Sequence, residues 1–283
     1  MTTSFTPKVV LVTGCSHGGI GFSLCEEYAS RGCTVYASAR RLEAMDAFKQ
    51  DNIHKVVLDV TKEEDVLRVV KTIIEKEGRV DVLVNNAGTL SVGPVIDVPM
   101  DIIERTYDTN VFSIIRMCKA VIPHMAARKS GTIVNISSVG AYFATPWGGI
   151  YGSTKAATHS LSDVLYMECT PLNISVVLVA TGSVRSNIST TQLAAFPGLP
   201  EDSLYKRFLP DMLARISMSQ EMDTMPTEVY ARKVVGQSLK ARPPRYLLLG
   251  GKTWTYALLK WLPRTAVLWL FWRMFSKIGR AAA

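Results

Sequence analysis

A tyrosine and a lysine four residues apart, Tyr151 and Lys155, are the pair in this sequence that is best suited to proton transfer. On a helix, side chains at this spacing share one face. A free tyrosine has a pKa of about 10, and lowering it to about 7 takes roughly 4 kcal/mol of phenolate stabilisation, which a nearby ammonium helps to supply. Ser138 could hold a substrate oxygen beside the tyrosine, and Asn110 could anchor a water molecule near the lysine. This set predicts general acid–base chemistry at an oxygen atom.

A glycine-rich turn at residues 13–21 forms a second candidate site. It lies between a predicted strand and a predicted helix, the context in which such a motif indicates phosphate binding. Gly14 would allow the tight turn, and Gly18 or Gly19 would let the backbone approach a pyrophosphate at the helix N-terminus. Gly21 would let the helix pack close to the sheet. We expect a dinucleotide to contact Gly14, Ser16, His17, Gly19, Ile20 and Gly21. A glycine-rich connection without a ligand is the alternative.

The end of the second predicted strand favours NADP(H) over NAD(H). NAD-selective sites usually carry Asp or Glu here, to bind the 2′-hydroxyl of the ribose. This sequence has Arg40 and Arg41 instead, and a guanidinium suits a 2′-phosphate through paired hydrogen bonds. We expect Arg40 to make the main contact, with Arg41 or His17 assisting. Two solvated arginines at a helix start are the alternative.

Strands and helices alternate along the chain around these residues. Short apolar, β-branched runs predict strands at 8–13, 34–39, 55–60, 80–84, 131–136 and 174–180. Helical patterns separate them at 22–31, 42–49, 62–76, 101–124 and 150–169. Such alternation implies right-handed crossovers and a parallel sheet with helices on both faces. The predicted fold is therefore α/β, a doubly wound parallel sheet (Rossmann fold) in a single domain.

The alternation ends near Arg185, and we expect residues 187–225 to form a helical lid over the substrate. Trp147 and Tyr142 could line the same pocket. The apolar lid side chains favour a lipophilic substrate, although packing against the sheet is their alternative role. These side chains are Leu193, Phe196, Leu199, Leu204, Phe208, Met212, Met218, Met222 and Met225. The predicted domain spans 1–251, and an apolar C-terminal segment spans 252–283.

Taken together, these residues resemble the short-chain dehydrogenase/reductase family. The resemblance covers about residues 8–186 and includes the glycine turn, Asn85-Asn86-Ala87-Gly88, Asn110, Ser138 and Tyr151-x-x-x-Lys155. It implies Tyr151 as the general acid/base and Ser138 as the partner of the substrate oxygen. It implies that Lys155 lowers the pKa of the tyrosine and binds the nicotinamide ribose, while Asn110 supports a proton relay.

The resemblance also implies further cofactor contacts. Asp59 and Val60 would lie beside the adenine, and Asn86, Ala87 and Gly88 would support the cofactor and the central sheet. Val184 would meet the carboxamide through its backbone. The family commonly forms dimers or tetramers, so a homo-oligomer is expected.

The sequence departs from the family pattern in two places. The glycine turn carries one extra residue, which leaves open whether Gly18 or Gly19 faces the pyrophosphate. The Pro-Gly that usually follows the sixth strand is replaced by residues 181–184, Thr-Gly-Ser-Val. Both departures are similar to the acyl-dihydroxyacetone-phosphate reductase branch, whose members sit on endoplasmic reticulum and lipid droplets. The same pattern is also similar to retinol and 17β-hydroxysteroid dehydrogenases.

The C-terminal segment 252–283 is basic as well as apolar. The chain has a net charge of +8, and this segment carries Lys and Arg but no Asp or Glu. Its longest uncharged run, Thr265–Trp272, is far shorter than the ~20 residues of a spanning helix. We expect it to lie in an anionic membrane interface, facing the cytosol at the endoplasmic reticulum or a lipid droplet. A docked helix or a subunit interface is the alternative, and nucleic acid is not expected as a partner.

Cysteine and histidine spacing favours neither disulfides nor a metal site. Five cysteines form no CxxC pair, and the four histidines form no HxxxH spacing. Reduced thiols in a cytosol-facing protein are the simplest interpretation. No signal or transit peptide is expected before the first strand, and no metal ligands are predicted.

The sequence thus predicts an NADPH-dependent reductase of a lipophilic ketone, or the reverse alcohol oxidation. Its substrate could be 1-acyl-dihydroxyacetone phosphate, or alternatively a steroid, retinoid or specialised-metabolite ketone. For a phosphate-bearing substrate, Arg185, Lys206 and Arg207 are the candidate cations. A non-catalytic NADP(H)-binding sensor or scaffold is the alternative of another class, and the intact Ser, Tyr, Lys and Asn set argues against it.

Overall fold

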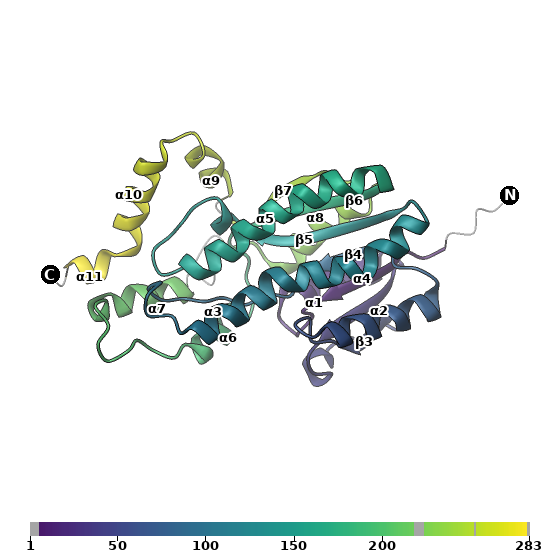
Figure 1. Cartoon of the computed structure of the whole chain (residues 1–283), viewed down its shortest axis with the longest axis horizontal. Helices are drawn as coiled ribbons and strands as arrows, with labels where there is room; N and C mark the ends of the chain where they lie inside the picture. Colours follow the sequence, from purple (N-terminus) through teal and green to yellow (C-terminus); the bar gives the residue numbers. More distant parts are fainter. Residues whose placement is uncertain (1–5, 218–223, 252, 282–283) are drawn as a thin grey trace.

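A seven-stranded parallel sheet forms the centre of the molecule (Figure 1). The computed structural model describes residues 6–217, 224–251 and 253–281. The strands lie in the order β3-β2-β1-β4-β5-β6-β7, and each neighbouring pair is parallel. Their bounds are β1 (Val9–Thr13), β2 (Thr34–Ala39), β3 (Ile53–Val57), β4 (Val82–Asn85), β5 (Gly131–Ser138), β6 (Ile174–Thr181) and β7 (Tyr246–Leu249). The predicted doubly wound α/β sheet is therefore confirmed.

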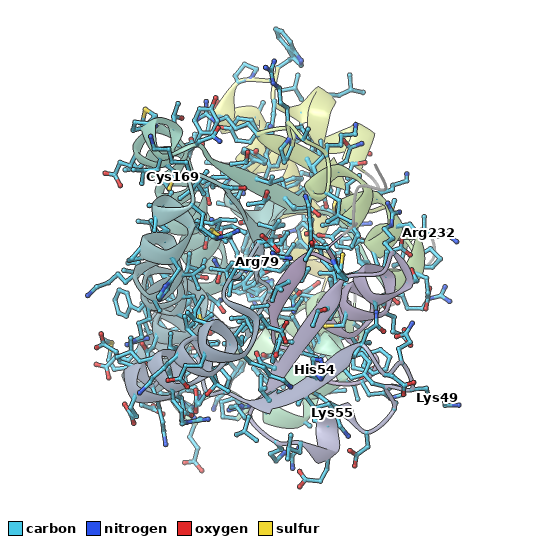
Figure 2. The ribbon with its side chains drawn as sticks, turned by 90° about the vertical axis from the view of Figure 1, so that its right-hand side faces the viewer. Lys49, His54, Lys55, Arg79, Cys169 and Arg232 are labelled. Atoms are coloured by element: carbon cyan, nitrogen blue, oxygen red, sulfur yellow. The ribbon has the colours of Figure 1, made fainter. Side chains whose placement is uncertain are left out.

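Helices cover both faces of the sheet, which explains why its central strands are continuously apolar. The covering helices are α1 (Ile20–Ser30), α2 (Glu63–Glu77), α4 (Ser113–Ala127), α5 (Gly149–Cys169) and α8 (Thr227–Ser238). One buried cluster joins α1 and α8 to the sheet, and another joins α2, α4 and α5 to the opposite face. Figure 2 shows this layering, because Cys169 of α5 and Arg232 of α8 lie on opposite sides of the strands.

The strand order reverses between β1 and β4, so the chain connections leave these two neighbours in opposite directions. A reversal of this kind opens a crevice at the carboxyl ends of the strands, where doubly wound folds bind ligands. The turn 14–19 follows β1, and the loop that begins at Asn86 follows β4. The two motifs predicted to hold a cofactor therefore meet at the crevice.

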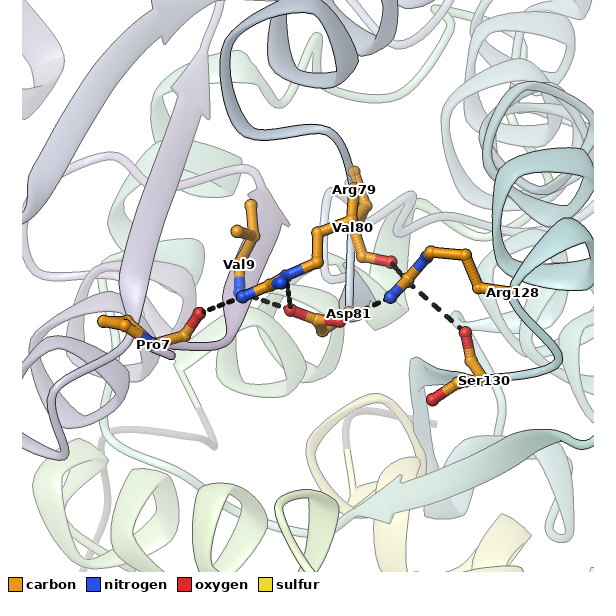
Figure 3. Close-up of polar contacts among 7 residues, drawn as sticks. All are labelled: Pro7, Val9, Arg79, Val80, Asp81, Arg128 and Ser130. Atoms are coloured by element: carbon orange, nitrogen blue, oxygen red, sulfur yellow. Dashed lines mark hydrogen bonds and ion pairs between the residues drawn. The ribbon is translucent and has the colours of Figure 1, made fainter. Parts of the chain in front are cut away.

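The opposite, amino edge of the sheet is closed by a polar network around Asp81 (Figure 3). Asp81 accepts hydrogen bonds from Val9 N at 2.8 Å, Arg79 Nε at 3.0 Å and Arg128 Nη1 at 3.0 Å. Arg128 also donates to Val80 O at 2.9 Å. One carboxylate thereby ties the start of β1 and the end of α4 to the start of β4.

Two predicted elements differ from the structure near the second and third strands. The helix expected at 42–49 is only a 3-10 turn, η1 (Glu43–Met45), because Phe48 turns back to stack on Phe22 of α1 at 4.0 Å. The third strand begins and ends earlier than predicted. It stops before Asp59, whose Oδ1 accepts hydrogen bonds from the backbone N and Oγ1 of Thr61 and bends the chain out of the sheet.

The single helix predicted over 101–124 is divided by a π-helical turn, η2 (Asp108–Phe112), between α3 (Met100–Tyr107) and α4. A π turn inserts one residue into a helix, and such insertions are frequent at functional sites. Sequence reasoning missed α8 and β7. Strand β7 has only four residues and its register is set by pairing with β6, a long-range contact.

The remaining helices gather at the carboxyl end of the sheet (Figure 1). They are α3, α6 (Ile188–Ala195), α7 (Leu209–Ser217), α9 (Thr253–Leu259), α10 (Arg264–Phe275) and α11 (Lys277–Ala281). Short turns η3 (Val139–Ala141), η4 (Thr170–Leu172) and η5 (Lys206–Phe208) complete the chain. The C-terminal α11 packs on α7 and η5. Among the described residues, every helix falls short of the length and apolarity that crossing a membrane requires.

Candidate active site

A cavity of about 1000 Å³ lies at the carboxyl ends of the strands. It brings together most of the residues predicted for cofactor binding and catalysis. The predicted residues that line it are Gly14, Ser16, His17, Gly19, Ile20, Arg40, Asp59, Val60, Asn86, Ala87, Gly88, Ser138, Tyr151, Lys155 and Val184. Three other predicted residues, Gly21, Arg41 and Asn110, lie outside its lining.

The glycine turn has the geometry of a cradle for a phosphate group. Gly14 has φ +72°, and a Cβ there would lie 2.8 Å from the Cα of Ala87. A Cβ on Gly21 would overlap the carbonyl oxygen of Gly14, so this glycine serves the packing of α1. Gly19 faces the cavity, whereas Gly18 lies against the Asn187 side chain. Of the two glycines, Gly19 is therefore the one on the cavity side of the turn.

The N-terminus of α1 is open to an anion. Its N-cap is Gly19, no side chain caps the helix, and its first turn contains no acidic residue. The first backbone N–H groups of a helix have no partner within the helix, and the helix dipole adds partial positive charge there. The cradle and this helix end fit the pyrophosphate of a dinucleotide.

Hydrogen bonds lock the two loops of the crevice to each other. Asn86 Nδ2 donates to Thr13 O at 2.8 Å and to Gly14 O at 3.0 Å. In return, Thr13 Oγ1 accepts from the backbone N of Asn86 and of Ala87, each at 3.0 Å. Asn86 therefore acts by fixing the shape of the glycine turn.

The residues expected around the adenosine lie at the far end of the cavity. Arg40 is exposed at the end of β2 and lines the cavity, and within the described residues no carboxylate pairs with it. Arg41 is exposed but points outside the lining, while His17 lies within it. Asp59 and Val60 line the same end. The cavity thus offers one free guanidinium where a 2′-phosphate is expected.

The candidate acid–base pair lies where β5 ends and α5 begins. Ser138 Oγ accepts a hydrogen bond from Gly140 N at 3.0 Å. Burial raises the pKa of Tyr151 above its ordinary value, while a hydrogen bond with Ser138 and the charge of Arg215 lower it. In the free chain burial outweighs both, so Tyr151 is a neutral phenol that can donate a proton.

Lys155 lies one turn further along α5, on the face of Tyr151. Its Nζ is 5.8 Å from the centre of the Tyr151 ring and donates to Ile136 O at 3.1 Å. Burial lowers the pKa of Lys155 to about 8. Near neutral pH the side chain is therefore still an ammonium.

Asn110 lies in the π turn η2, behind the cavity wall. Its Oδ1 accepts from Thr89 N at 2.8 Å, and its Nδ2 donates to Thr89 O at 2.9 Å and to Thr154 Oγ1 at 3.0 Å. The side chain is thus fully engaged with protein groups. It holds the loop after β4 against α5, close to Gly88 and the ammonium of Lys155.

The segment expected to form the lid contributes helices α6 and α7 beside the cavity, but several of its apolar side chains do not line it. Phe208 and Met212 pack with Trp147 in a cluster outside the lining, whereas Ile216 of the same cluster also lines the cavity. Leu193 and Leu204 are exposed, and Met225 packs against the sheet core. Tyr142 also lies outside the lining. Met218 and Met222 lie outside the described residues.

Sequence reasoning missed the residues that form the substrate side of the cavity. The C-terminal tail supplies Tyr256, Leu259, Phe271 and Phe275, and α7 supplies Arg215. No motif marks these positions. The tail reaches the cavity only through long-range packing, in which Trp147 Nε1 donates to Phe275 O at 2.8 Å.

Comparison with known proteins is consistent with this geometry. The family model described as short chain dehydrogenase matches residues 8–195. A short-chain dehydrogenase of Penicillium ochrochloron is 37% identical over 83% of this chain and 86% of its own length. The NADPH-dependent 1-acyldihydroxyacetone phosphate reductase of Saccharomyces cerevisiae is 33% identical over 84% of this chain and 80% of its own. Among solved structures, a short-chain dehydrogenase from Streptomyces avermitilis matches with TM-score 0.79 and 29% identity, covering 99% of this chain and 100% of its own.

Burial of Lys155 predicts a variant that is more stable but inactive. The pKa of Lys155 is lowered from 10.5 to about 8, so below pH 8 the folded chain holds a disfavoured ammonium. Without cofactor at pH 7, we expect Lys155→Met to raise the free energy of unfolding by up to about 3 kcal/mol. As the pH rises, the Lys155 ammonium of the wild type loses its proton near pH 8 in the folded state but only near pH 10.5 in the unfolded state. The free energy of unfolding of the wild type therefore increases between these two pH values, and the advantage of Lys155→Met shrinks.

Calorimetric unfolding at pH 7 and at pH 9.5 measures this effect. Lys119→Met, on the exposed face of α4, is the matched control and should show no pH-dependent gain. A Lys155→Met variant that is less stable than the wild type at pH 7 would contradict the proposed cost of the buried ammonium.

Proposed function

The chain belongs to the short-chain dehydrogenase family of oxidoreductases, and we propose that it is an NADPH-dependent reductase of a lipophilic ketone, able to run the reverse alcohol oxidation. The observation that carries this proposal is a single cavity, lined at one end by the glycine cradle and Arg40. Its middle holds Ser138, Tyr151 and Lys155, and its other end is walled by apolar side chains of the tail.

In the proposed reaction, the chain's own residues bind and protonate the substrate oxygen. Bound NADPH supplies the hydride that reduces the carbonyl carbon. Ser138 Oγ holds the carbonyl oxygen, and the neutral phenol of Tyr151 donates its proton to the nascent alkoxide. Lys155, beside the ring, stabilises the phenolate that remains. Asn110 holds the loop that follows β4 against α5, and this contact fixes the position of Lys155.

The preference for NADPH rests on Arg40. It lines the adenosine end of the cavity, and a guanidinium offers a phosphate two parallel N–H donors. Relatives named as NADPH-dependent reductases, at 33% and 36% identity, support the same cofactor. The strand end carries no carboxylate that would select a ribose hydroxyl.

The lipophilic character of the substrate rests on the tail wall of the cavity. Leu259 and Phe271 are buried there, with Tyr256 packed against them. The relatives named as 1-acyldihydroxyacetone phosphate reductases favour an acyl-bearing ketone. A steroid, retinoid or specialised-metabolite ketone is the alternative that the same wall supports.

We also propose that the C-terminal segment 252–283, besides walling the cavity, attaches the enzyme to an anionic lipid surface, such as endoplasmic reticulum or a lipid droplet facing the cytosol. Trp261 is 88% exposed and Trp269 is 58% exposed, on a segment without Asp or Glu. Aromatic rings at headgroup depth with cations toward phosphates are typical of interfacial helices. Leu258 and Leu262 extend this exposed apolar surface.

Self-association is a further proposal about partners. Exposed apolar side chains lie on η2, α4 and α5, where Phe112, Ile115 and Met167 are 48%, 39% and 60% exposed. A two-fold contact through these helices would bury them.

Tyr151→Phe tests the proposed reaction. Removing the phenolic proton donor should lower kcat/KM for ketone reduction by about 10²–10⁴-fold, because general acid catalysis contributes that range. Binding of NADPH, followed by its fluorescence, should change little. Tyr166→Phe, an exposed tyrosine on the same helix, is the matched control. Full turnover in the Tyr151→Phe variant would rule out this mechanism. If the wild type binds NADPH tightly but reduces no ketone, the alternative of a non-catalytic NADP(H)-binding sensor would be favoured.

Arg40→Ser tests the cofactor preference. We expect kcat/KM with NADPH to fall by about 10- to 100-fold, because a charge-assisted hydrogen bond to phosphate is lost, while the value with NADH changes little. Arg41→Ser is the control, since Arg41 lies outside the cavity lining. Steady-state kinetics with NADPH and with NADH measure this preference. If the ratio of the two kcat/KM values is unchanged in Arg40→Ser, Arg40 does not select NADPH.

The tail proposal is tested with the double variant Trp261→Glu, Trp269→Glu. Replacing two exposed rings by carboxylates should reduce co-sedimentation with phosphatidylserine-containing vesicles at least about tenfold. Leu67→Glu, which introduces a carboxylate at an exposed position of α2 outside the tail, is the control and should leave vesicle binding unchanged. Failure of the wild type to bind these vesicles at low salt would contradict the proposal.

A further inference from the structure

One charged side chain in the substrate end of the cavity has no role in the proposed reaction. Arg215, on α7, lines the cavity beside the tail wall. Its guanidinium lies 5.7 Å from the Phe275 ring centre, and its Nε is buried without a hydrogen-bond partner. Its Nη2 would lie 3.8 Å from a Cβ placed on Gly148, the N-cap of α5. Arg215 therefore lies beside the N-terminus of α5, the helix that carries Tyr151.

The acidic side chains around the cavity are already engaged elsewhere. Asp97 accepts from Ser203 Oγ at 2.6 Å, Asp108 pairs with Arg116 at 2.6 Å, and Asp59 binds Thr61. One turn before Arg215 on α7, Asp211 accepts from Ile278 N at 3.1 Å. Within the described ranges no ion pair joins Arg215 to a carboxylate. Arg215 is half-buried with its Nε shielded from water, and a guanidinium in this position without a counter-ion is costly, a cost that a bound anion would reduce.

Arg215 shares the cavity lining with two tyrosines, Tyr151 and Tyr256. Tyr151 and Tyr256 both interact with it, and burial lowers its pKa. Arg215 therefore lies near the reacting oxygen and at the start of the apolar wall. A ligand that satisfies both features carries an acidic group close to its ketone and an apolar chain that runs toward Leu259 and Phe271.

We propose that Arg215 binds the acidic group, a phosphate or a carboxylate, of an amphiphilic ketone substrate. This inference rests on the proposed function and narrows its substrate class to anionic ketones. The cations expected from the sequence do not reach this position, because Arg185, Lys206 and Arg207 are exposed and lie outside the cavity lining.

Matched substrate pairs test the assignment. One pair is 1-palmitoyl-dihydroxyacetone phosphate and its dephosphorylated form, and the other is 3-oxohexadecanoate and its methyl ester. We expect the wild-type enzyme with NADPH to prefer the acidic member of one pair by at least about tenfold in kcat/KM. The preferred pair distinguishes phosphate from carboxylate. Arg215→Met should bring that ratio close to one, and Arg215→Lys should keep part of it.

Arg207→Met is the control, because Arg207 lies in the same lid segment and stacks on Phe208 outside the cavity. It should keep the wild-type ratio. Equal loss on both members of a pair in Arg215→Met, or a wild-type ratio near one in both pairs, would overturn the assignment. In the first case Arg215 would act through Tyr151 alone, which a shifted pH profile on the neutral ketone would reveal.

A binding measurement separates this inference from the proposed reaction. The quenching of tryptophan fluorescence by 1-palmitoyl-glycerol 3-phosphate, by hexadecanoate and by 1-palmitoylglycerol requires no turnover. Arg215→Met should weaken binding of the preferred anion at least about tenfold and leave the neutral lipid within about twofold. If the enzyme reduces no ketone, the proposed function is wrong. The comparison of anionic and neutral lipid binding still decides whether Arg215 binds an acidic group. Equal binding of anionic and neutral lipids by the wild type would refute it.

Discussion

The hydrogen-bonded junction between the loops after β1 and β4 is the contact on which the rest of the site depends. Asn86 and Thr13 exchange bonds across it at 2.8–3.0 Å, and the packing leaves no room for a side chain at Gly14 or Gly21. This junction exists because the strand order reverses between these two strands. Asp81 closes the amino edge of the same strands, so the backbone that must meet a cofactor is held at both ends.

Burial sets the electrostatics of the cavity. It raises the pKa of Tyr151 and lowers those of Lys155 and Arg215, so each shift opposes the charged form. The acidic residues near the cavity bind other protein groups and do not compensate these cations. The free chain therefore holds uncompensated positive charge near its proton donor. An anionic ligand would neutralise part of that charge, which links the proposed binding of an anionic substrate to the electrostatics of the catalytic residues.

The sequence was most informative where chemistry is local. The glycine turn, the Tyr151–Lys155 spacing and the strands of the first two-thirds of the chain follow from nearest-neighbour patterns, and the structure has these elements. The stretch 42–49 has helical periodicity, yet the stacking of Phe48 on Phe22 outweighs it. Strand β7 depends on its register with β6. Arg215 is one arginine in an aperiodic segment, and only the fold places it in the cavity.

The C-terminal segment both lines the cavity and presents exposed aromatic side chains, a combination that its sequence pattern does not predict. Leu259 and Phe271 face the body of the enzyme and line the cavity, with Val267 buried beside them, while Trp261 and Trp269 face outward. One side of the same segment is thus cavity wall and the other is exposed aromatic surface. If the outward side lies in a lipid interface, the apolar chain of a substrate passes from the bilayer to the cavity along one short segment. The substrate's acidic group would then be the last part to leave water, and Arg215 lies where it would arrive.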